Sequence, residues 1–261
     1  MRNNSKNIPF SVSQNFLTSQ KTIFRLIKIA KIKETDRIVE IGAGKGHITR
    51  VLARQCKEVI SYEIDPKLYA RLYPQLPENV NLIYGDFLQA RLPSTPYRVF
   101  ANIPFSRTTE IVRKLTGGNS IPEDCWLIME KGAAKRFCGK PYDSLQSLLL
   151  KPFFDVEIRY YFRTEDFHPA PRVDVVMLHL LRKEKPDISF HQRKDYAFFL
   201  RACLQHGFGG RGSLLSLRQA NMALRNAGLP EIYKQSKTML YVQWLCLFRW
   251  WFRENKSPRH L

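Results

Sequence analysis

A glycine-rich segment and an acid follow two short apolar stretches early in the 261-residue chain. The stretch Arg37–Ile41 runs into the glycines of segment 42–46 (GAGKG), and Glu63 stands 21 residues after Gly42. Glycines allow a tight turn that brings a ligand close to the backbone, and an acid at about this distance can accept hydrogen bonds from ribose hydroxyls. No Walker Gly-Lys-Ser/Thr follows, and His47 stands where the dinucleotide fingerprint needs glycine. The pattern indicates a site for some other nucleoside-containing ligand.

Two further stretches end in residues that can accept hydrogen bonds from an amino group. Asp86 follows the third stretch, and the segment 102–105 (NIPF) follows the fourth. Pro104 stiffens its turn, so that backbone carbonyls and the Asn102 amide oxygen can point into a cleft. Phe105 offers a ring on which a base can stack, a contact worth ~1–3 kcal/mol. Acceptors for an exocyclic amine beside an aromatic ring favour N-alkylation of an adenine or cytosine.

The elements that carry these residues alternate between strand-like and helix-like patterns. We expect helices over His47–Gln55 and Thr108–Leu115, and another after a Thr18-Ser19 cap. Such alternation predicts an α/β fold with a mostly parallel sheet, made mixed by a hairpin of the last two strands. The seven expected strands are Arg37–Ile41, Glu58–Tyr62, Asn81–Tyr84, Arg98–Ala101, Trp126–Met129, Val156–Phe162 and Val173–Leu181. Ligands of such sheets bind at the carboxyl ends of the strands, where the four polar stretch ends would meet.

The charge balance indicates a polyanionic partner. The chain carries 42 Lys and Arg against 23 Asp and Glu, a net charge of +19, and nucleic acid is the leading candidate. Residues 182–261 hold +10 of this excess and are expected to form helices, with an aromatic run over Trp244–Phe252 that we interpret as helix packing. We therefore expect two domains, a ligand-binding domain over residues 1–185 and a small basic α-helical domain over residues 186–261.

Several classes are disfavoured by what the chain lacks. The five cysteines are scattered without a C-x-x-C pair, which indicates reduced thiols and speaks against a structural zinc, so no metal site is expected. No apolar run reaches the ~20 residues that span a bilayer, and segment 1–7 is polar. We expect a cytoplasmic protein with no membrane partner.

Four ordered segments resemble the rRNA adenine N6-methyltransferases. They are segments 13–17 (SQNFL), 40–46 (EIGAGKG), 102–105 (NIPF) and 167–174 (FHPAPRVD). Within that superfamily the chain most resembles the Erm enzymes of macrolide–lincosamide–streptogramin B resistance, to which Ile103 before Pro104 and segment 129–136 (MEKGAAKR) point. The likeness runs from about Ser13 to Leu181 and is looser beyond.

The resemblance implies a Rossmann-like, class I methyltransferase fold and S-adenosylmethionine as cofactor. By this likeness the catalytic residues are Asn102, Ile103, Pro104, Phe105 and Phe167, with Phe105 standing where tyrosine is commoner and Phe167 as a second stacking ring. The implied cofactor contacts are Asn15, Leu17, Gly42, Gly44, Glu63, Ile64, Asp86, Phe87 and Asn102.

The implied substrate is an adenine of 23S rRNA, in nascent or protein-poor large-subunit RNA, methylated once or twice at N6 by a monomer. Oxygens of Asn102 and of the Ile103 and Pro104 carbonyls would accept the amine N–H groups and localise the nitrogen lone pair, so no general base is needed. The expected phosphate contacts are Arg107, Arg113, Lys131, Lys135, Arg136 and Lys140.

Two alternatives stay open. The first is a small-subunit rRNA adenine dimethyltransferase of ribosome biogenesis, which differs in its RNA. The second is a nucleic-acid-binding relative without catalysis, which would fail to bind S-adenosylmethionine.

Overall fold

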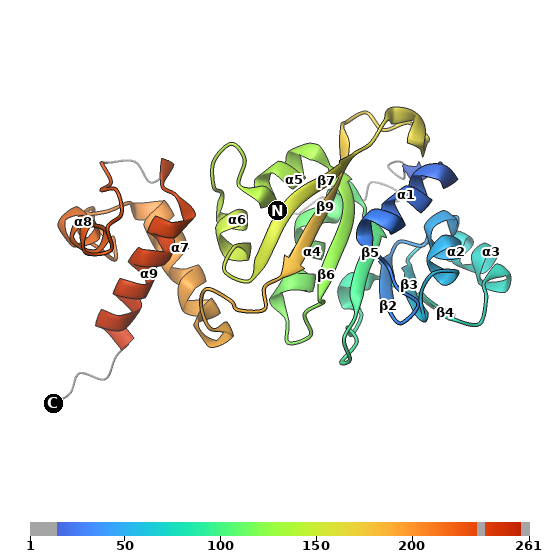
Figure 1. Cartoon of the computed structure of the whole chain (residues 1–261), viewed down its shortest axis with the longest axis horizontal. Helices are drawn as coiled ribbons and strands as arrows, with labels where there is room; N and C mark the ends of the chain where they lie inside the picture. Colours follow the sequence, from blue (N-terminus) through green and yellow to red (C-terminus); the bar gives the residue numbers. More distant parts are fainter. Residues whose placement is uncertain (1–14, 234–237, 257–261) are drawn as a thin grey trace, which may run out of the picture. The chain divides into compact units, whose positions relative to one another are not determined.

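The computed structural model describes residues 15–233 and 238–256, and its central element is a seven-stranded sheet (Figure 1). The strand order is β4-β3-β2-β5-β6-β9-β7. The strands are β2 (Arg37–Ile41), β3 (Glu58–Glu63), β4 (Val80–Tyr84), β5 (Arg98–Asn102), β6 (Asp124–Glu130), β7 (Phe154–Tyr161) and β9 (Val175–Arg182). The seven expected strands are all present, so the predicted Rossmann-like sheet is confirmed.

The strand directions bring the predicted site residues to one edge of the sheet. Strands β2 to β6 are parallel to their neighbours, while β9 is antiparallel to β6. The Phe162 N–H donates to the Val175 carbonyl at 3.1 Å, which begins the expected hairpin of β7 and β9. Because parallel strands end at the same edge, the residues that follow β2, β3, β4 and β5 meet there, where α/β sheets bind ligands.

Nine α-helices lie within the described residues. They are α1 (Gln20–Ala30), α2 (His47–Ala53), α3 (Pro66–Leu72), α4 (Thr108–Gly117), α5 (Lys131–Cys138), α6 (Leu145–Leu150), α7 (Arg193–His206), α8 (Leu217–Asn226) and α9 (Tyr241–Lys256). The first begins at the predicted cap, because the Ser19 side chain accepts the Thr22 N–H. No described helix is long and apolar enough to cross a membrane.

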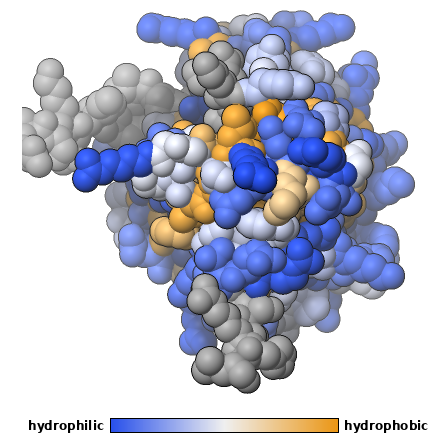
Figure 2. All heavy atoms as spheres, turned by 90° about the vertical axis from the view of Figure 1, so that its left-hand side faces the viewer, coloured by the Kyte–Doolittle hydropathy of each residue, from blue (hydrophilic) through white to orange (hydrophobic). Residues whose placement is uncertain are grey.

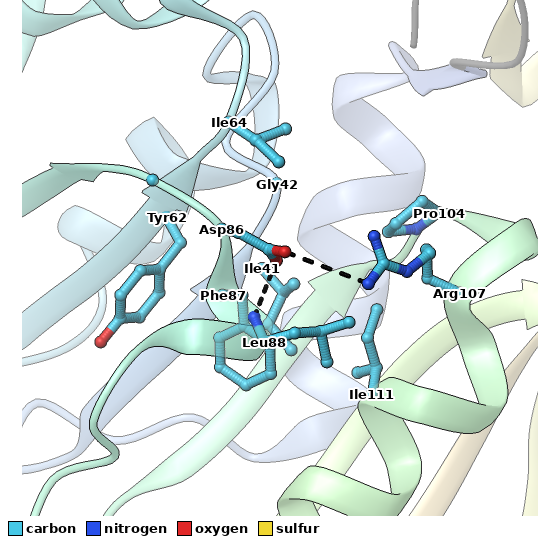
Figure 3. Close-up of a pocket in the computed structure, with 11 residues that line it drawn as sticks. Ile41, Gly42, Tyr62, Ile64, Asp86, Phe87, Leu88, Pro104, Arg107 and Ile111 are labelled. Carbon is cyan, nitrogen blue, oxygen red and sulfur yellow. Dashed lines mark hydrogen bonds and ion pairs between the residues drawn. The ribbon is translucent and has the colours of Figure 1, made fainter. Parts of the chain in front are cut away.

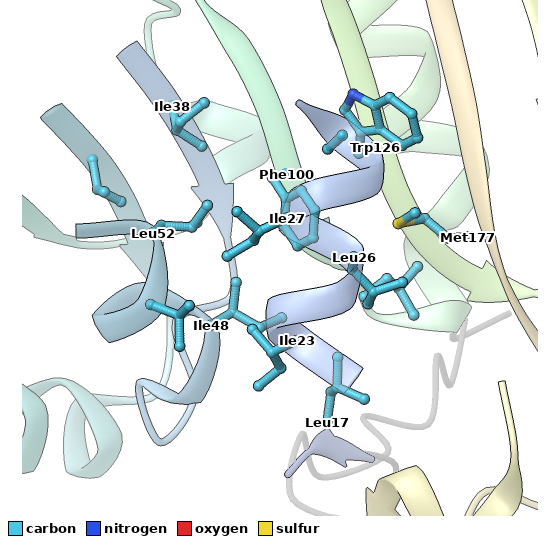
Figure 4. Close-up of a cluster of buried hydrophobic side chains, with 14 of the residues drawn as sticks. Leu17, Ile23, Leu26, Ile27, Ile38, Ile48, Leu52, Phe100, Trp126 and Met177 are labelled. Atoms are coloured by element: carbon cyan, nitrogen blue, oxygen red, sulfur yellow. The ribbon is translucent and has the colours of Figure 1, made fainter. Parts of the chain in front are cut away.

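A hydrophobic cluster joins α1 and α2 to the sheet (Figure 4). Ile23 and Ile27 of α1 face Ile48 and Leu52 of α2, and all four side chains are buried. The helical spacing of the α1 residues puts its apolar face on this cluster, which leaves the opposite face of the helix in solvent. The start of α1 is thereby held against the glycine-rich turn that precedes α2.

A two-stranded sheet that the sequence pattern does not predict lies beside this cluster. Strand β1 (Phe16–Leu17) pairs antiparallel with β8 (Phe167–His168). Two residues are too few to show the alternation that identifies a strand, so this pairing could not be read from the sequence. It brings two segments of the family resemblance, about 150 residues apart, next to each other.

The described chain divides into two compact units. Unit 1 holds the residues up to Ala134 and Glu157–Leu181, whereas unit 2 holds Lys135–Val156 and the chain from Arg182 onward. The expected boundary at residue 185 therefore misses one segment, because 135–156 groups with the C-terminal helices and its helix α6 packs on α7. The assignment of separate functions to 1–185 and 186–261 stays a prediction.

The core of unit 2 is aromatic. Tyr196 and Phe199 of α7 pack on Phe248 of α9, and Phe199 also contacts Trp251. Trp244, Phe248 and Trp251 are at most 7% exposed, so the interpretation of the aromatic run as helix packing is confirmed.

Candidate active site

The glycine-rich turn after β2 requires glycine at its centre. Gly42 and Gly44 have φ angles of 79° and 58°, a region that other residues rarely adopt. A Cβ on Gly44 would also lie 2.8 Å from Cε1 of the Phe16 ring. The turn therefore presents bare backbone between β1 and the end of β2.

Glu63 ties this turn to the end of β3. One carboxylate oxygen, Oε2, accepts the Gly44 N–H at 2.7 Å, and Oε1 accepts the Asp65 N–H at 2.8 Å. The side chain is only 2% exposed. Each carboxylate oxygen has two lone pairs, so acceptor capacity remains for the predicted ribose contact, which stays a prediction.

A pocket with apolar walls and one acid opens at the same edge (Figure 3). Its lining residues are Ile41, Gly42, Tyr62, Ile64, Gly85, Asp86, Phe87, Leu88, Pro104, Arg107 and Ile111. Asp86 Oδ1 accepts the Leu88 N–H at 2.8 Å, and Oδ2 lies 4.0 Å from Nη2 of Arg107. Apolar walls that cover a flat ring, with a carboxylate able to accept from its amine, fit the adenine of S-adenosylmethionine.

The structure thus brings together five of the predicted residues in one pocket: Gly42, Ile64, Asp86, Phe87 and Pro104. It also adds Arg107, which the sequence pattern assigned only to RNA. Arg107 pairs with Glu110 at 2.8 Å as well as facing Asp86, so its guanidinium is part of the pocket wall. In the sequence, the only indication that Arg107 could lie in the pocket was its position just after segment 102–105 (NIPF).

Asn102 ends β5 with its amide held in a defined orientation. Its Nδ2 donates to the Asn15 carbonyl at 2.8 Å, and a carbonyl can only accept, so the other end of the amide must be the oxygen. That oxygen, Oδ1, is buried and has no hydrogen-bond partner within the described residues. A buried acceptor without a donor costs about 1–3 kcal/mol, which a bound amine would recover.

The turn after Asn102 partly uses its carbonyls within the protein. The Pro104 carbonyl accepts the Arg107 N–H at 3.0 Å, and the Phe105 carbonyl accepts from the Thr108 hydroxyl at 2.9 Å. One lone pair of the Pro104 oxygen therefore remains for a substrate. The Ile103 side chain is buried, so only its backbone can serve the predicted role, whereas the Phe105 ring is half-buried.

Two predicted site residues turn their side chains into the core instead. Phe167 is 4% exposed and packs on Phe162 with ring centroids 5.2 Å apart, so it offers no open ring face in this structure, and its role as a second stacking ring stays a prediction. The reason is strand alternation in β8, which points Phe167 inward and His168 outward. Leu17, its partner in β1, is likewise 2% exposed, so only its backbone can reach a cofactor.

The cations predicted to hold RNA fall into two groups. Lys131 pairs with Asp174 at 2.9 Å, and Arg107 is paired as described above. Arg113, Lys135, Arg136 and Lys140 are exposed.

Unit 2 has a groove between α8 and α9, with Arg249 and Arg253 among its lining residues. Figure 2 shows a face of this unit on which hydrophobic side chains gather among hydrophilic ones.

One buried acid in β2, two residues before the glycine-rich segment, had no role in the sequence prediction. Glu40 is 1% exposed, and its Oε2 accepts from the hydroxyls of Thr49 and Ser61 at 2.7 and 2.6 Å, while Oε1 has no described partner. Burial, together with the nearby charge of Glu63, raises the pKa of Glu40 from 4.5 to about 7. Glu40 therefore holds β2 in place where the glycine-rich turn begins.

The described residues contain no cluster of three or more His, Cys, Asp or Glu that could hold a metal.

The family of the chain follows from comparison with known proteins. The model of the family described as ribosomal RNA adenine dimethylase matches residues 4–207. The chain belongs to this family. An rRNA adenine N-6-methyltransferase of Escherichia coli is 34% identical over 249 residues, which cover 94% of this chain and 96% of that protein.

Solved structures agree with this membership. The 23S rRNA methyltransferase ErmE superposes with a TM-score of 0.77 at 29% identity, covering 90% of this chain and 98% of that one. A dimethyladenosine transferase from Plasmodium falciparum has a TM-score of 0.72 at 21% identity, covering 92% and 98%, and shares the fold. The family member described here is thus an S-adenosylmethionine-dependent rRNA adenine methyltransferase, as the resemblance implied.

Proposed function

We propose that this methyltransferase modifies N6 of one adenine in 23S rRNA and thereby confers macrolide–lincosamide–streptogramin B resistance. The similarity to ErmE over nearly the whole of both chains supports the choice of large-subunit RNA. The observation on which the chemistry rests is the buried, unpartnered Oδ1 of Asn102 at the edge of the sheet where the pocket opens. We propose a monomer that acts in the cytoplasm on nascent or protein-poor RNA.

In this proposal, some residues at this edge of the sheet bind the cofactor and others bind the target adenine. We propose that Asp86 and the apolar pocket hold the adenine of S-adenosylmethionine, while its amino-acid part lies along the bare backbone of the glycine-rich turn and the backbone of Asn15 and Leu17. Bound S-adenosylmethionine supplies an electrophilic methyl group. Glu63 keeps the turn closed through the Gly44 N–H and accepts from the ribose hydroxyls with its remaining lone pairs.

The target adenine binds on the other side of the Asn102 turn. Its N6 amine donates one N–H to Asn102 Oδ1 and the other to a backbone carbonyl of Ile103 or Pro104, which draws the nitrogen lone pair out of conjugation with the ring. Phe105 supports the extruded base, and such stacking offsets part of the few kcal/mol that extrusion costs. Orientation of the amine then does most of the catalytic work, since well-oriented reactants can save ~7–11 kcal/mol of barrier. The methylated nitrogen loses its proton to water.

The test is methyl transfer from labelled S-adenosylmethionine to protein-free large-subunit and small-subunit rRNA, offered separately, with the modified base mapped. We expect label on one adenine of the large-subunit RNA and none on the small-subunit RNA. Label on the small-subunit RNA alone would overturn the proposed target and favour the ribosome-biogenesis enzyme. Expression in a macrolide-sensitive bacterium tests the second half of the proposal, and unchanged sensitivity to macrolides despite labelled large-subunit RNA would contradict it.

A further inference from the structure

Helices α1 and α2 carry charge of one sign only. Residues 15–33 contain five Lys or Arg and no Asp or Glu, and residues 41–57 contain four Lys or Arg and again no acid. The two helices pack side by side through Ile23, Ile27, Ile48 and Leu52 (Figure 4). The side chains that these two segments expose to solvent therefore include cations and no acid.

The outer face of α1 presents a row of cations with an aromatic ring among them. Burial of Ile23, Ile27 and their neighbours leaves Lys21, Arg25 and Lys28 exposed, one turn apart. At 1.5 Å per residue, Lys21 to Lys28 spans roughly 10 Å along the helix, so the three cations form one row that can follow a sugar–phosphate backbone. Phe24 lies in the same row and is 40% exposed, although an apolar ring gains nothing from solvent.

The cations of this face are not neutralised by ion pairs with other described residues. Arg98 pairs with Asp36 and Asp124 at 2.7 Å, and Lys183 pairs with Asp187 at the same distance. By contrast, none of Lys21, Arg25, Lys28 and Arg54 has an ion pair within the portion of the chain that the structure describes. A surface that concentrates unneutralised charge pays in self-repulsion and gains when a polyanion binds.

A hollow lies where the start of α1 meets α2. It has a volume of about 230 Å³ and is lined by Gln20, Gly46, His47, Arg50, Val51 and Arg54. Arg50 is held by the Lys45 carbonyl and Gln75 Oε1 at 2.9 and 2.8 Å, whereas Arg54 is exposed. Burial and the charges of Arg50 and Lys45 lower the pKa of His47, as expected where cations crowd without an acid.

We propose that the α1–α2 basic face (Lys21, Phe24, Arg25 and Lys28 of α1 with Arg54 directly after α2) binds the sugar–phosphate backbone of the substrate RNA beside its target adenine, with the hollow as a phosphate subsite. Gly46 of the hollow and Gly42 of the active-site pocket belong to the same glycine-rich segment, so RNA that reaches the pocket can also reach this face. Phe24 provides a ring for an unpaired base. The inference rests on the proposed function insofar as the bound polyanion is the rRNA that the enzyme methylates.

The experiment compares two triple variants that remove the same charge. One is Lys21→Gln/Arg25→Gln/Lys28→Gln. The other, the control, is Lys67→Gln/Arg71→Gln/Arg91→Gln, which changes three exposed cations in and after α3. Binding of each protein to protein-free 23S rRNA is measured over a range of KCl concentrations, together with S-adenosylmethionine affinity and Tm.

We expect the first variant to bind RNA at least about tenfold more weakly and to reduce the slope of log K against log salt by about 2–3, since each lost phosphate contact reduces it by about 0.9. The control should change the slope by less than 1, and both variants should keep wild-type cofactor affinity and Tm. Equal losses in the two variants would mean that only net charge matters and would overturn the proposal, as would unchanged binding of the first variant. If the triple variant fails to fold, Arg25→Gln and Arg54→Gln singly carry the same test with a slope change of about 1 each.

Binding and methylation separate this inference from the proposed function. If the wild type methylates no large-subunit adenine, the proposed target is wrong. The difference between the two variants in RNA binding then still shows whether the α1–α2 basic face binds RNA. If the wild type methylates the expected adenine and both variants bind RNA equally well, the proposed role of the α1–α2 basic face is wrong, whereas the proposed target is supported.

Discussion

Asn102 Nδ2 donates to the backbone carbonyl of Asn15 at 2.8 Å, which joins two residues that are 87 positions apart. The bond leaves the Asn102 oxygen as the unpaired end of the amide, buried and without a described donor. In the proposed mechanism, Asn15 therefore sets the orientation of the oxygen that accepts the amine of the substrate.

Asn102→Ala should reduce kcat for methyl transfer by at least about 100-fold, a loss typical when one oriented polar group of an active site is removed. Folding should be largely retained, with about 0.5–1.5 kcal/mol lost together with the hydrogen bond to the Asn15 carbonyl, and cofactor affinity should change far less than kcat. Single-turnover transfer to RNA and calorimetric binding of S-adenosylmethionine measure the two effects. Wild-type turnover in this variant would refute the acceptor role of Asn102.

Phe105→Ala should weaken productive RNA binding by roughly 1–3 kcal/mol, the range of one base–aromatic stacking contact. Phe105→Tyr keeps the ring face and should retain nearly full activity, so the pair separates stacking from general damage to the turn. The comparison requires kcat and KM for the RNA with each variant. Equal activity of the alanine and tyrosine variants would leave no role for stacking.

Gly44→Ala should impair cofactor binding at least tenfold, because its Cβ would meet Cε1 of Phe16 at 2.8 Å and force the turn to move. Gly228→Ala is the matched control, since Gly228 has a similar φ of 66° but open space where its Cβ would lie. Both variants should lose about 1–2 kcal/mol of stability from the left-handed backbone. Only Gly44→Ala should change the dissociation constant for S-adenosylmethionine, and a similar change in the control would contradict the contact argument.

Stability should fall with rising pH through the titration of Glu40. Its pKa in the folded protein is raised to about 7 from an ordinary value of 4.5, so the folded state holds this proton more tightly than the unfolded state does. The contribution is complete below about pH 4.5 and is lost as the pH rises through 7, with a total on the order of 3 kcal/mol.

Glu40→Gln removes this titration, so its free energy of unfolding should vary less between pH 5.5 and pH 8 than that of the wild type. Urea denaturation at both pH values measures the difference, and subtraction of the two proteins cancels the other titrating groups. Parallel pH profiles for wild type and variant would show that Glu40 does not titrate in this range.

Much of the candidate site could be predicted from the sequence, because its residues lie at or next to the ends of strands. Gly42, Glu63, Asp86 and Asn102 each stand at or just after the end of an apolar run, and chain direction alone places the ends of parallel strands on one edge. The same local patterns predicted the Ser19 cap and the hairpin of β7 and β9. Glycine at position 44 was likewise predicted, although the contact that demands it was not.

Contacts between distant segments decided the rest. The β1–β8 register sends Phe167 into the core and His168 outward, and a register has no signature in two-residue strands. Ion pairing engages Arg107 and Lys131 but leaves Lys21, Arg25 and Lys28 unneutralised, which depends on which acids folding brings near. Local periodicity and chain direction were therefore enough to predict the sheet, the edge at which the pocket opens and the candidate acceptor residues. Which side chains line the pocket and which cations lack an ion pair depends on packing between residues far apart in the chain, so these features could be identified only from the folded protein.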